Sequence, residues 1–335
     1  MSSNADLIIS TGFQENGLPV LIAPPKGRET TDKVNGKLWP TYSDLIQEAA
    51  AKHLPVSGGI LFRGFAGEQT QEKFCNEFAK LFADSLLSYE FGSTPRTDLG
   101  DGVYTATEYP SHQVIPLHNE QSYTLNWPLN IWFHCVLAPK DGGETPIADS
   151  RRIYNKMPID IRQRFESKKL TYVRNYGNGL DLGWEQVFNT DSKVEVESYC
   201  RKHQINFKWK DGGELRTWQK CQATAQHHTS KEWVWFNQAH LFHVSNIDPA
   251  TREILLDVVE VQDLPRNVYY GDGSEIEESI LAEIRGVLDE ETVYFPWHQG
   301  DFLMLDNMLS AHGRSTFSGD RKIVVAMANA YSLSL

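Results

Sequence analysis

Residues 292–328 have the sequence TVYFPWHQGDFLMLDNMLSAHGRSTFSGDRKIVVAMA, in which short apolar runs alternate with turn-forming residues. Three of these runs are predicted strands: Thr292–Pro296, Asp301–Leu305 and Lys322–Ala328. Similar runs occur earlier in the chain, at Leu129–Leu137, Leu170–Tyr176 and Trp233–Asn237. Many short strands separated by Gly, Pro, Asn and Asp are typical of a sandwich or jelly roll rather than of alternating β-α units. The sequence therefore predicts a mainly β fold.

Helices are expected on both sides of this strand-rich part. Apolar residues at helical spacing predict helices at Ser43–Lys52, Thr70–Phe82, Ser150–Lys168, Lys193–His203 and Ser274–Leu288. Two short strands, Val20–Ala23 and Gly59–Phe65, are expected before Tyr104, where the strand-rich reading begins. The fold class expected is thus mainly β with flanking helices.

Composition excludes several classes of function. The 335 residues include 32 basic and 44 acidic side chains, a formal charge of −12. Nucleic acids and anionic membranes both attract a positive surface, so neither is expected as a partner. No apolar run reaches the length of a membrane span, and Met1–Asn16 lack the pattern of a secretory signal, so a cytoplasmic protein is expected. The spacing of the four cysteines resembles neither a disulfide framework nor a zinc site, so buried thiols are expected.

A candidate metal site begins at His118, the one histidine of eleven that has a carboxylate two positions later, at Glu120. Residues i and i+2 of a strand face the same side, although composition alone supplies about one such pair by chance. His312, in DNMLSAHGR, adds a second imidazole. Two imidazoles and one carboxylate form the facial triad of non-heme Fe(II) oxygenases, which leaves positions open for a cosubstrate and dioxygen.

Arg321 is a candidate anchor for such a cosubstrate. It precedes the apolar run 322–328 and follows His312 by nine positions. The planar guanidinium group can meet a carboxylate of 2-oxoglutarate with two hydrogen bonds. An arginine at this place is, taken alone, also the ordinary solvated end of a strand, so its assignment depends on the histidine before it.

Seven motifs, taken in order, carry a resemblance over nearly the whole chain. They are LPVLI (18–22), GILFRGF (59–65), PLHNEQSY (116–123), GGETPIADSR (142–151), WFNQAHLFH (235–243), DNMLSAHGR (306–314) and DRKI (320–323). In this order the sequence resembles the TauD/TfdA family of Fe(II)/2-oxoglutarate-dependent dioxygenases. Within that family it is similar to the branch associated with nonribosomal peptide pathways, which includes the syringomycin-pathway aspartyl hydroxylase.

The resemblance implies a double-stranded β-helix (jelly roll) and an assignment of site residues. His118, Glu120 and His312 are implied as iron ligands, with 2-oxoglutarate and O2 as cosubstrates. Thr145 and Arg321 are implied as the residues that bind 2-oxoglutarate. Further candidates, which would orient the ligands or line the substrate cavity, are Asn119, Gln121, Tyr123, Trp235, Asn237, Gln238, Asn307 and Arg314.

Two departures from the commoner family pattern narrow the chemistry. The carboxylate ligand is Glu120 rather than Asp, and its retention argues for oxygen transfer, because halogenating relatives carry Gly or Ala there. The position four beyond Arg321, where several members have a second Arg that grips an anionic substrate, is Val325. A free sulfonate substrate such as taurine is therefore disfavoured.

The expected function is hydroxylation of an unactivated C–H bond in an amino-acid-like substrate within a secondary-metabolite pathway. The substrate is either free or held on a peptidyl carrier protein. Desaturation, another oxidative outcome, or a non-catalytic cupin-like metal-binding protein are the alternatives. The basic residues Arg151, Arg152 and 162–169 form either a solvated helix face or a contact for an acidic carrier protein. His240 and His243, in HLFH, fit a packed segment better than a second metal pair.

One domain, 1–335, is expected, because ligands far apart in the sequence must meet at one ion. Its N-terminal helix and strand part is 1–103. The jelly-roll segments that carry the ligands are 104–149 and 291–335. The remaining residues, about 150–288, are expected to be an insertion that shapes the substrate cavity.

Overall fold

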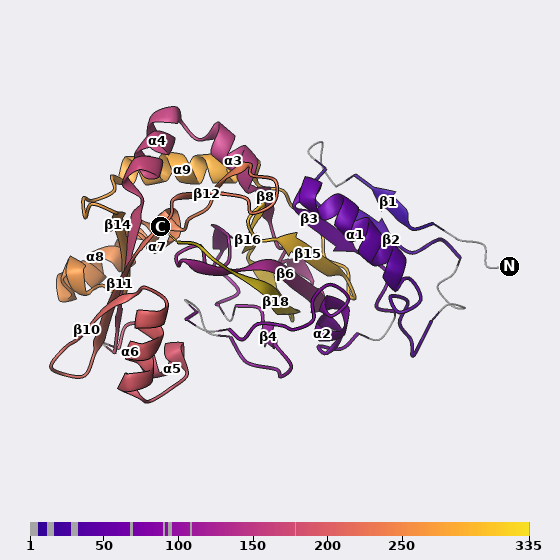
Figure 1. The fold of residues 1–335 in the computed structure, drawn as a ribbon, viewed down its shortest axis with the longest axis horizontal. Helices are drawn as coiled ribbons and strands as arrows, with labels where there is room; N and C mark the ends of the chain where they lie inside the picture. Colours follow the sequence, from indigo (N-terminus) through magenta and orange to yellow (C-terminus); the bar gives the residue numbers. More distant parts are fainter. Residues whose placement is uncertain are drawn as a thin grey trace.

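A seven-stranded sheet lies at the centre of the computed structural model, which describes residues 6–11, 17–27, 33–67, 70–89, 91–92, 96–107, 109–177 and 179–334 (Figure 1). Its strand order is β1-β2-β3-β15-β6-β18-β4. The strands are β1 (Ile8–Ser10), β2 (Val20–Ala23), β3 (Gly59–Phe62), β15 (Phe302–Asp306), β6 (Asn126–Leu137), β18 (Lys322–Ser332) and β4 (Val103–Thr105). All neighbours pair antiparallel except β2 and β3, which are parallel.

The central strands are buried on both faces, which explains their nearly continuous apolar sequences. On β18, Val324 and Ala326 pack into a cluster with the N-terminal helices, whereas Ile323 and Val325 pack into a cluster on the opposite face. The same alternation occurs on β6 and β15. Side chains of successive strand residues point to opposite faces, so one short run builds two cores.

A smaller sheet supplies the second layer of the jelly roll. It has the order β5-β16-β8 and is made of β5 (Ile115–His118), β16 (Ser310–Arg314) and β8 (Ile147–Asp149). A short antiparallel pair is formed by β7 (Asp141–Gly142), which precedes β8 in the chain, and β17 (Phe317–Ser318), which follows β16. Phe133 of β6 has its ring centroid 5.0 Å from that of His312 on β16, so the two sheets face each other. The predicted mainly β jelly roll with flanking helices is confirmed.

Two N-terminal helices cover the outer face of the large sheet. They are α1 (Ser43–Ser57) and α2 (Phe74–Ala79). Phe78 of α2 stacks on Phe302 of β15 with ring centroids 4.2 Å apart, and Phe62 of β3 packs edge-on against Phe78 at 5.1 Å. This aromatic cluster anchors the N-terminal part, drawn in indigo in Figure 1, to the central strands.

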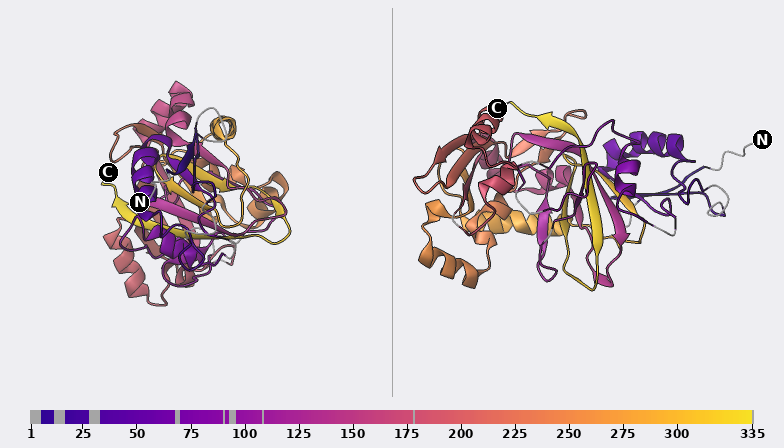
Figure 2. Two further views of the ribbon diagram at one scale, coloured as in Figure 1. Left: turned by 90° about the vertical axis from the view of Figure 1, so that its right-hand side faces the viewer. Right: turned by 90° about the horizontal axis from the view of Figure 1, so that it is seen from below.

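The residues between β8 and β15 form a second lobe at the other end of the molecule (Figure 2). A four-stranded antiparallel sheet, β10-β11-β9-β14, lies within it. The elements are α3 (Ser150–Lys156), α4 (Ile159–Lys168), β9 (Leu170–Tyr176), α5 (Trp184–Phe188), α6 (Lys193–Lys202), β10 (Asn206–Trp209), β11 (Leu215–Cys221), β12 (Thr224–Gln226), β13 (Trp233–Trp235), α7 (Ala239–Phe242), α8 (Pro249–Val258), β14 (Arg266–Tyr270) and α9 (Glu278–Glu291), with 3-10 turns at Val244–Asn246 and Val261–Asp263. Its core includes Leu117 of β5 and Ala311 of β16, so the insertion packs directly on the strands of the small sheet.

Two sequence predictions of elements are wrong. The single helix expected at Ser150–Lys168 is two helices, because Pro158 disfavours a helical conformation at Met157, whose ψ is 129°. The strand expected at Thr292–Pro296 is absent, and only Val293 pairs, with Ile147. That run begins directly after α9 and ends at Pro296, and its neighbour β8 has only three residues. The pairing is therefore limited to one β-bridge.

Other expectations are met or differ only at the ends of elements. The helix expected at Thr70–Phe82 is shorter, at Phe74–Ala79, and the helix expected at Ser274–Leu288 lies at Glu278–Glu291. All four cysteines are buried free thiols. Within the described ranges no helix is both long and apolar enough to cross a membrane. Much of Met1–Asn16, on which the expectation about a secretory signal rests, lies outside the described residues.

Candidate active site

Strands β5 and β16 bring the predicted metal ligands together. His118 is the last residue of β5 and pairs directly with His312 in the middle of β16. The two imidazole rings have centroids 4.5 Å apart, and one potential ligand atom from each of His118, Glu120 and His312 lies within 4.8 Å of the others. Glu120 follows in a turn and not on the strand, so the shared strand face assumed from the sequence is not what aligns it with His118.

Asn307 fixes the backbone of that turn. Its Oδ1 accepts the Glu120 N–H at 2.7 Å, and its Nδ2 donates to the Glu120 carbonyl at 2.9 Å and to the Pro128 carbonyl at 2.9 Å. Asn119 donates in return to the Asn307 carbonyl at 2.7 Å and to Ser150 Oγ at 3.0 Å. The segment before β16 therefore holds the turn that carries Glu120.

Gln238 supports the same turn from the insertion. Its Nε2 donates to the Asn119 carbonyl at 2.8 Å, and its backbone N–H donates to the Tyr172 hydroxyl at 2.8 Å. Asn237 donates to the Ala223 carbonyl at 2.7 Å and does not contact the ligands. Of the residues predicted near the site, Asn119, Asn307 and Gln238 are thus the ones that brace the Glu120 turn.

Both histidines are in the form that binds a metal ion. The Nδ1–H of His118 donates to the Pro116 carbonyl at 2.8 Å, which leaves the lone pair on Nε2. Burial lowers the pKa of His118 and lowers that of His312 further, so the neutral imidazoles dominate. The Nδ1 of His312 is buried with no hydrogen-bond partner in the described part of the chain, and its Nε2 lies 3.9 Å from Glu120 Oε2.

Arg96 is a site residue that the sequence analysis missed. Its Nη2 donates to Glu120 Oε2 at 2.7 Å, and the two side chains are 3% and 5% exposed. Its guanidinium carbon lies 4.4 Å from the centroid of the Tyr89 ring. Arg96 stands in GSTPRTDLG, a polar, turn-rich segment without periodicity, so no local signal marks it as buried.

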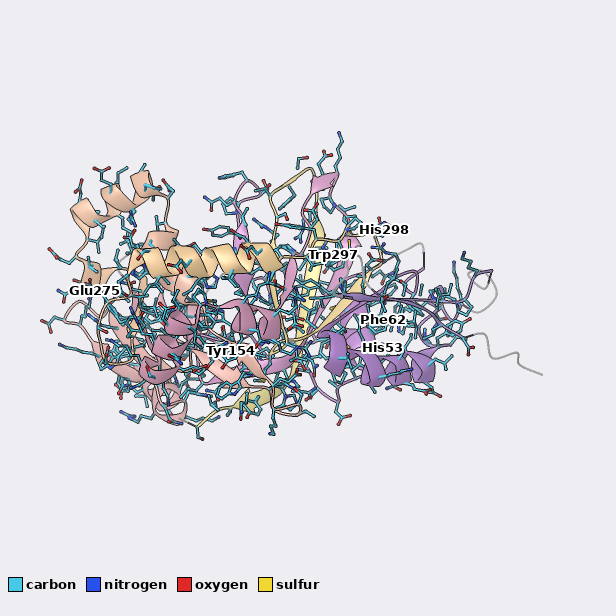
Figure 3. All side chains as sticks on the ribbon, turned by 90° about the horizontal axis from the view of Figure 1, so that it is seen from above. His53, Phe62, Tyr154, Glu275, Trp297 and His298 are labelled. Carbon is cyan, nitrogen blue, oxygen red and sulfur yellow. The ribbon has the colours of Figure 1, made fainter. Side chains whose placement is uncertain are left out.

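Arg321 contacts the loop between β7 and β8, which contains Thr145. Arg321 Nε donates to the carbonyl of Gly143, two positions before Thr145, at 2.9 Å. Burial and the nearby Arg314 lower the pKa of Arg321 to about 10, against smaller opposing effects of Cys135 and Glu144, and no ion pair of Arg321 is found among the described residues. Thr145 Oγ1 accepts the indole N–H of Trp297 at 3.1 Å, and Figure 3 labels Trp297 beside the central strands. A partly buried guanidinium group that forms no ion pair is suited to binding an anionic ligand.

Four other predicted residues lie elsewhere. Arg314 does not touch the ligands but donates to the carbonyls of Tyr109, Pro110 and Gln113, which lead into β5. The Tyr123 hydroxyl donates to the Phe91 carbonyl at 2.9 Å. Trp235 packs in the core of the insertion, 5.1 Å from Phe165, and Gln121 lines a small cavity of about 150 Å³ with Thr124 and Tyr199.

His240 and His243 do not form a metal pair. His240 Nε2 contacts the Leu117 carbonyl at 2.8 Å, and His243 Nδ1 contacts Ser245 Oγ at 2.9 Å. In the described ranges neither residue joins a cluster of potential ligands. The HLFH segment is therefore packed, as expected, and His240 holds the backbone next to His118.

Comparison with known proteins assigns this site to a family. The model of the family described as "Taurine catabolism dioxygenase TauD, TfdA family" matches residues 22–327. The chain belongs to the TauD/TfdA family. It is therefore a non-heme iron dioxygenase that uses Fe(II), 2-oxoglutarate and O2, and the resemblance inferred from the motifs is confirmed.

Individual relatives support this membership of the TauD/TfdA family. The chain is 39% identical over 274 residues to the dapdiamide synthesis protein DdaC of Enterobacter agglomerans, covering 82% of this chain and 83% of DdaC. It is 28% identical over 325 residues to a clavaminate synthase-like protein of Arabidopsis thaliana, covering 94% of each. The structure of PvcB from Pseudomonas aeruginosa, titled an Fe, alpha-ketoglutarate dependent oxygenase from an isonitrile synthetic pathway, shares the fold with a TM-score of 0.52, 15% identity and coverage of 98% and 92%.

The donor set fits the metal of a TauD/TfdA dioxygenase. Two neutral imidazoles and one carboxylate suit Fe(II), and their ligand atoms lie within 4.8 Å of one another. The four thiols are buried elsewhere and take no part in this set. His118, Glu120 and His312 could therefore hold iron and leave coordination positions for 2-oxoglutarate and O2.

Replacing Asn307 with alanine should destabilise both the fold and the site. The change leaves the Glu120 backbone N–H and carbonyl buried without their partners, which costs about 2–4 kcal/mol of unfolding free energy. We expect metal affinity to fall roughly 10- to 100-fold, as for other groups that orient ligands. Urea unfolding and a metal titration measure the two effects, and Asn206→Ala, at an exposed position of β10, is the matched control. Unchanged metal affinity in a folded Asn307→Ala variant would contradict this role.

Proposed function

We propose that this protein hydroxylates an unactivated C–H bond of an amino-acid-like small molecule in a secondary-metabolite pathway. In this proposal His118, Glu120 and His312 bind Fe(II), and Thr145 and Arg321 bind 2-oxoglutarate. The observation that carries it is the convergence of three potential ligand atoms within 4.8 Å of one another, from the end of β5, the turn that follows it and β16. Family membership supplies the cosubstrates, and DdaC, a relative in dapdiamide synthesis, supplies the kind of pathway.

In this proposal the protein's own residues position the metal ligands and 2-oxoglutarate. Bound Fe(II), with 2-oxoglutarate and O2, supplies the oxidising power to replace hydrogen by hydroxyl, and the cosubstrate leaves as succinate and CO2. Arg321 would hold the distal carboxylate of 2-oxoglutarate with two hydrogen bonds, and the Thr145 hydroxyl would donate a third. Asn119, Asn307 and Gln238 keep the Glu120 turn in place, so the protein contributes a fixed geometry.

Oxygen transfer is favoured over the alternatives by two residues. Glu120 is present, so the metal position has its carboxylate ligand and lacks the vacancy that halide transfer needs. Arg321 is partly buried and forms no ion pair among the described residues, an arrangement that a bound anion would stabilise. A cupin-like protein that only bound metal would have no use for such a cation, so the site supports a catalyst.

Contacts on the basic helix face favour a free substrate over docking of an acidic carrier protein at that face. Arg151 pairs with Asp149 at 2.8 Å, Arg164 pairs with Glu277 at 2.9 Å, and Lys168 pairs with Asp272 at 2.9 Å. Because these three cations are matched by acids of the same chain, they leave less positive charge on this face for a partner. We further propose that residues 1–335 act as one domain, since the insertion shares its core with β5 and β16.

Succinate release tests this proposal. The Fe(II)-loaded chain is incubated with 2-oxoglutarate, O2 and a panel of free amino acids, and then with the same amino acids tethered to a carrier protein. A substrate should stimulate succinate formation and yield a product one oxygen atom heavier. A product lighter by two hydrogens would show desaturation instead. Metal binding without succinate formation for any member of either panel would favour the non-catalytic alternative.

A further inference from the structure

Arg96 is a buried cation whose charge partner is an expected metal ligand. Its Nη2 lies 2.7 Å from Glu120 Oε2, and no other ion pair of Arg96 is found in the described residues. A guanidinium group is not deprotonated in proteins, so Arg96 carries a positive charge. Arg96 and Glu120 thus balance each other as long as Glu120 has no second cation to neutralise.

Loading of the site removes this balance. Fe(II) would bring two positive charges, and histidine binds a metal ion as neutral imidazole, so Glu120 and the chelating carboxylate of 2-oxoglutarate would neutralise them. The distal carboxylate of 2-oxoglutarate is matched by Arg321. The positive charge of Arg96 then has no counterpart, and an unpaired buried charge is strongly unfavourable. The loaded site therefore requires one more negative charge beside Arg96.

The hydrogen-bonding state of Arg96 indicates where that charge would bind. Its Nε and Nη1 are buried and have no hydrogen-bond partner among the described residues. The guanidinium carbon lies over the Tyr89 ring, 4.4 Å from its centroid, so the ring covers one side of the group. A planar guanidinium with free N–H donors matches a carboxylate, which can accept two of them.

The other buried guanidinium groups near the site are already engaged. Arg174 donates to the carbonyls of Phe91 and Gly92, at 3.4 and 2.9 Å. Arg314 donates to three carbonyls of the segment before β5. Position 325, where several TauD/TfdA proteins have a second Arg, is a buried valine on β18. Arg96 is the cation that remains for a second anionic ligand.

We propose that Arg96 binds a free carboxylate of the organic substrate, so the substrate class is a carboxylic acid. This inference rests on the proposed function, because it places the substrate beside the iron site. The contact to Glu120 puts the bound carboxylate close to the metal ligands and hence orients the rest of the molecule at the site. An amino acid tethered as a thioester would need a second carboxylate, in its side chain, to be accepted.

Acetate is a suitable probe, with acetamide as its uncharged analogue. The full chain, loaded anaerobically with Fe(II) and 2-oxoglutarate, is titrated with each compound and followed by calorimetry and by the visible charge-transfer band. We expect saturable binding of acetate and none of acetamide. Acetate binding should weaken when Fe(II) is omitted, because Arg96 then pairs with Glu120. Arg96→Met should weaken binding to the loaded chain at least about tenfold, and Arg96→Lys should restore part of it.

The outcomes separate this inference from the proposed function. If the charge-transfer band forms in the wild type but acetate does not bind, Arg96 is not an anion site and the inference is overturned. Equal acetate affinity in the wild type and in an Arg96→Met variant that still forms the band would also overturn it. Failure of the band to form in the wild type would overturn the proposed function itself. If Arg96→Met does not fold, the inference is tested by Arg96→Lys, which should bind acetate more weakly than the wild type. It is also tested by the comparison of acetate with acetamide in the wild type.

Discussion

His312→Ala should abolish the charge-transfer band that Fe(II) and 2-oxoglutarate form in the wild-type protein, and turnover with it. The imidazole of His312 is one of three groups that could hold the ion, and its removal leaves His118 and Glu120 as a two-residue site. Loss of a neighbouring orienting group alone lowers metal affinity by about 10- to 100-fold, so loss of a ligand should exceed that range. Anaerobic titration with Fe(II), monitored by visible absorbance, measures the effect.

His53→Ala is the matched control for this change. His53 lies on α1, where Figure 3 labels it, and does not belong to the ligand cluster, so its loss should leave the band unchanged. Circular dichroism establishes that the His312→Ala variant is folded. A folded His312→Ala protein with a full-strength band would show that the triad is wrongly assigned.

Arg321→Leu should raise the KM for 2-oxoglutarate by roughly 30- to 1000-fold, the range expected for loss of a buried charged pair. The leucine keeps the bulk of the side chain but supplies neither the charge nor the N–H donors for the distal carboxylate. Metal affinity should change little, because Arg321 does not belong to the ligand cluster. Steady-state succinate formation at varied 2-oxoglutarate, together with a metal titration without cosubstrate, measures both quantities.

Lys322→Leu provides the comparison, since Lys322 is the next residue, is exposed and pairs with Glu72. It should leave the KM for 2-oxoglutarate near that of the wild type. An equal loss of metal and cosubstrate affinity in Arg321→Leu would mean that Arg321 supports the fold and does not bind the cosubstrate.

The centre of the fold was predictable because its strands are short, apolar and separated by turn residues. Leu170–Tyr176 is a strand with the predicted bounds, and Lys322–Ala328 lies within β18. Thr292–Pro296 has the same composition but forms no strand, since strand formation also needs a partner edge long enough to pair with. Periodicity reports what a segment can form, whereas the neighbouring segments decide whether it does.

The candidate ligands were predictable from residue type and motif, whereas their surroundings were not. His118, Glu120 and His312 were found because the motifs that contain them resemble a known family. Arg96 was missed because its importance comes from burial against Glu120, a contact between loops that no local pattern encodes. Trp297, which donates to Thr145, was likewise invisible, because that contact joins residues far apart in the chain.

The hydrogen bonds from Asn307 to the Glu120 backbone bear on how the substrate range of such a protein can change in evolution. Residues 306–314 include His312 and also Asn307, which holds the Glu120 turn, so nine consecutive residues carry one ligand and fix the backbone of another. One short, buried segment thus positions two of the three expected metal ligands. We expect that the insertion between β8 and β15 can exchange residues or change length without rebuilding the metal position, provided that its contacts to β5 and β16 and the hydrogen bond from Gln238 to the Glu120 turn persist. If the insertion shapes the substrate cavity, as the sequence predicts, changes in this one lobe would alter the substrate while the metal ligands stay the same.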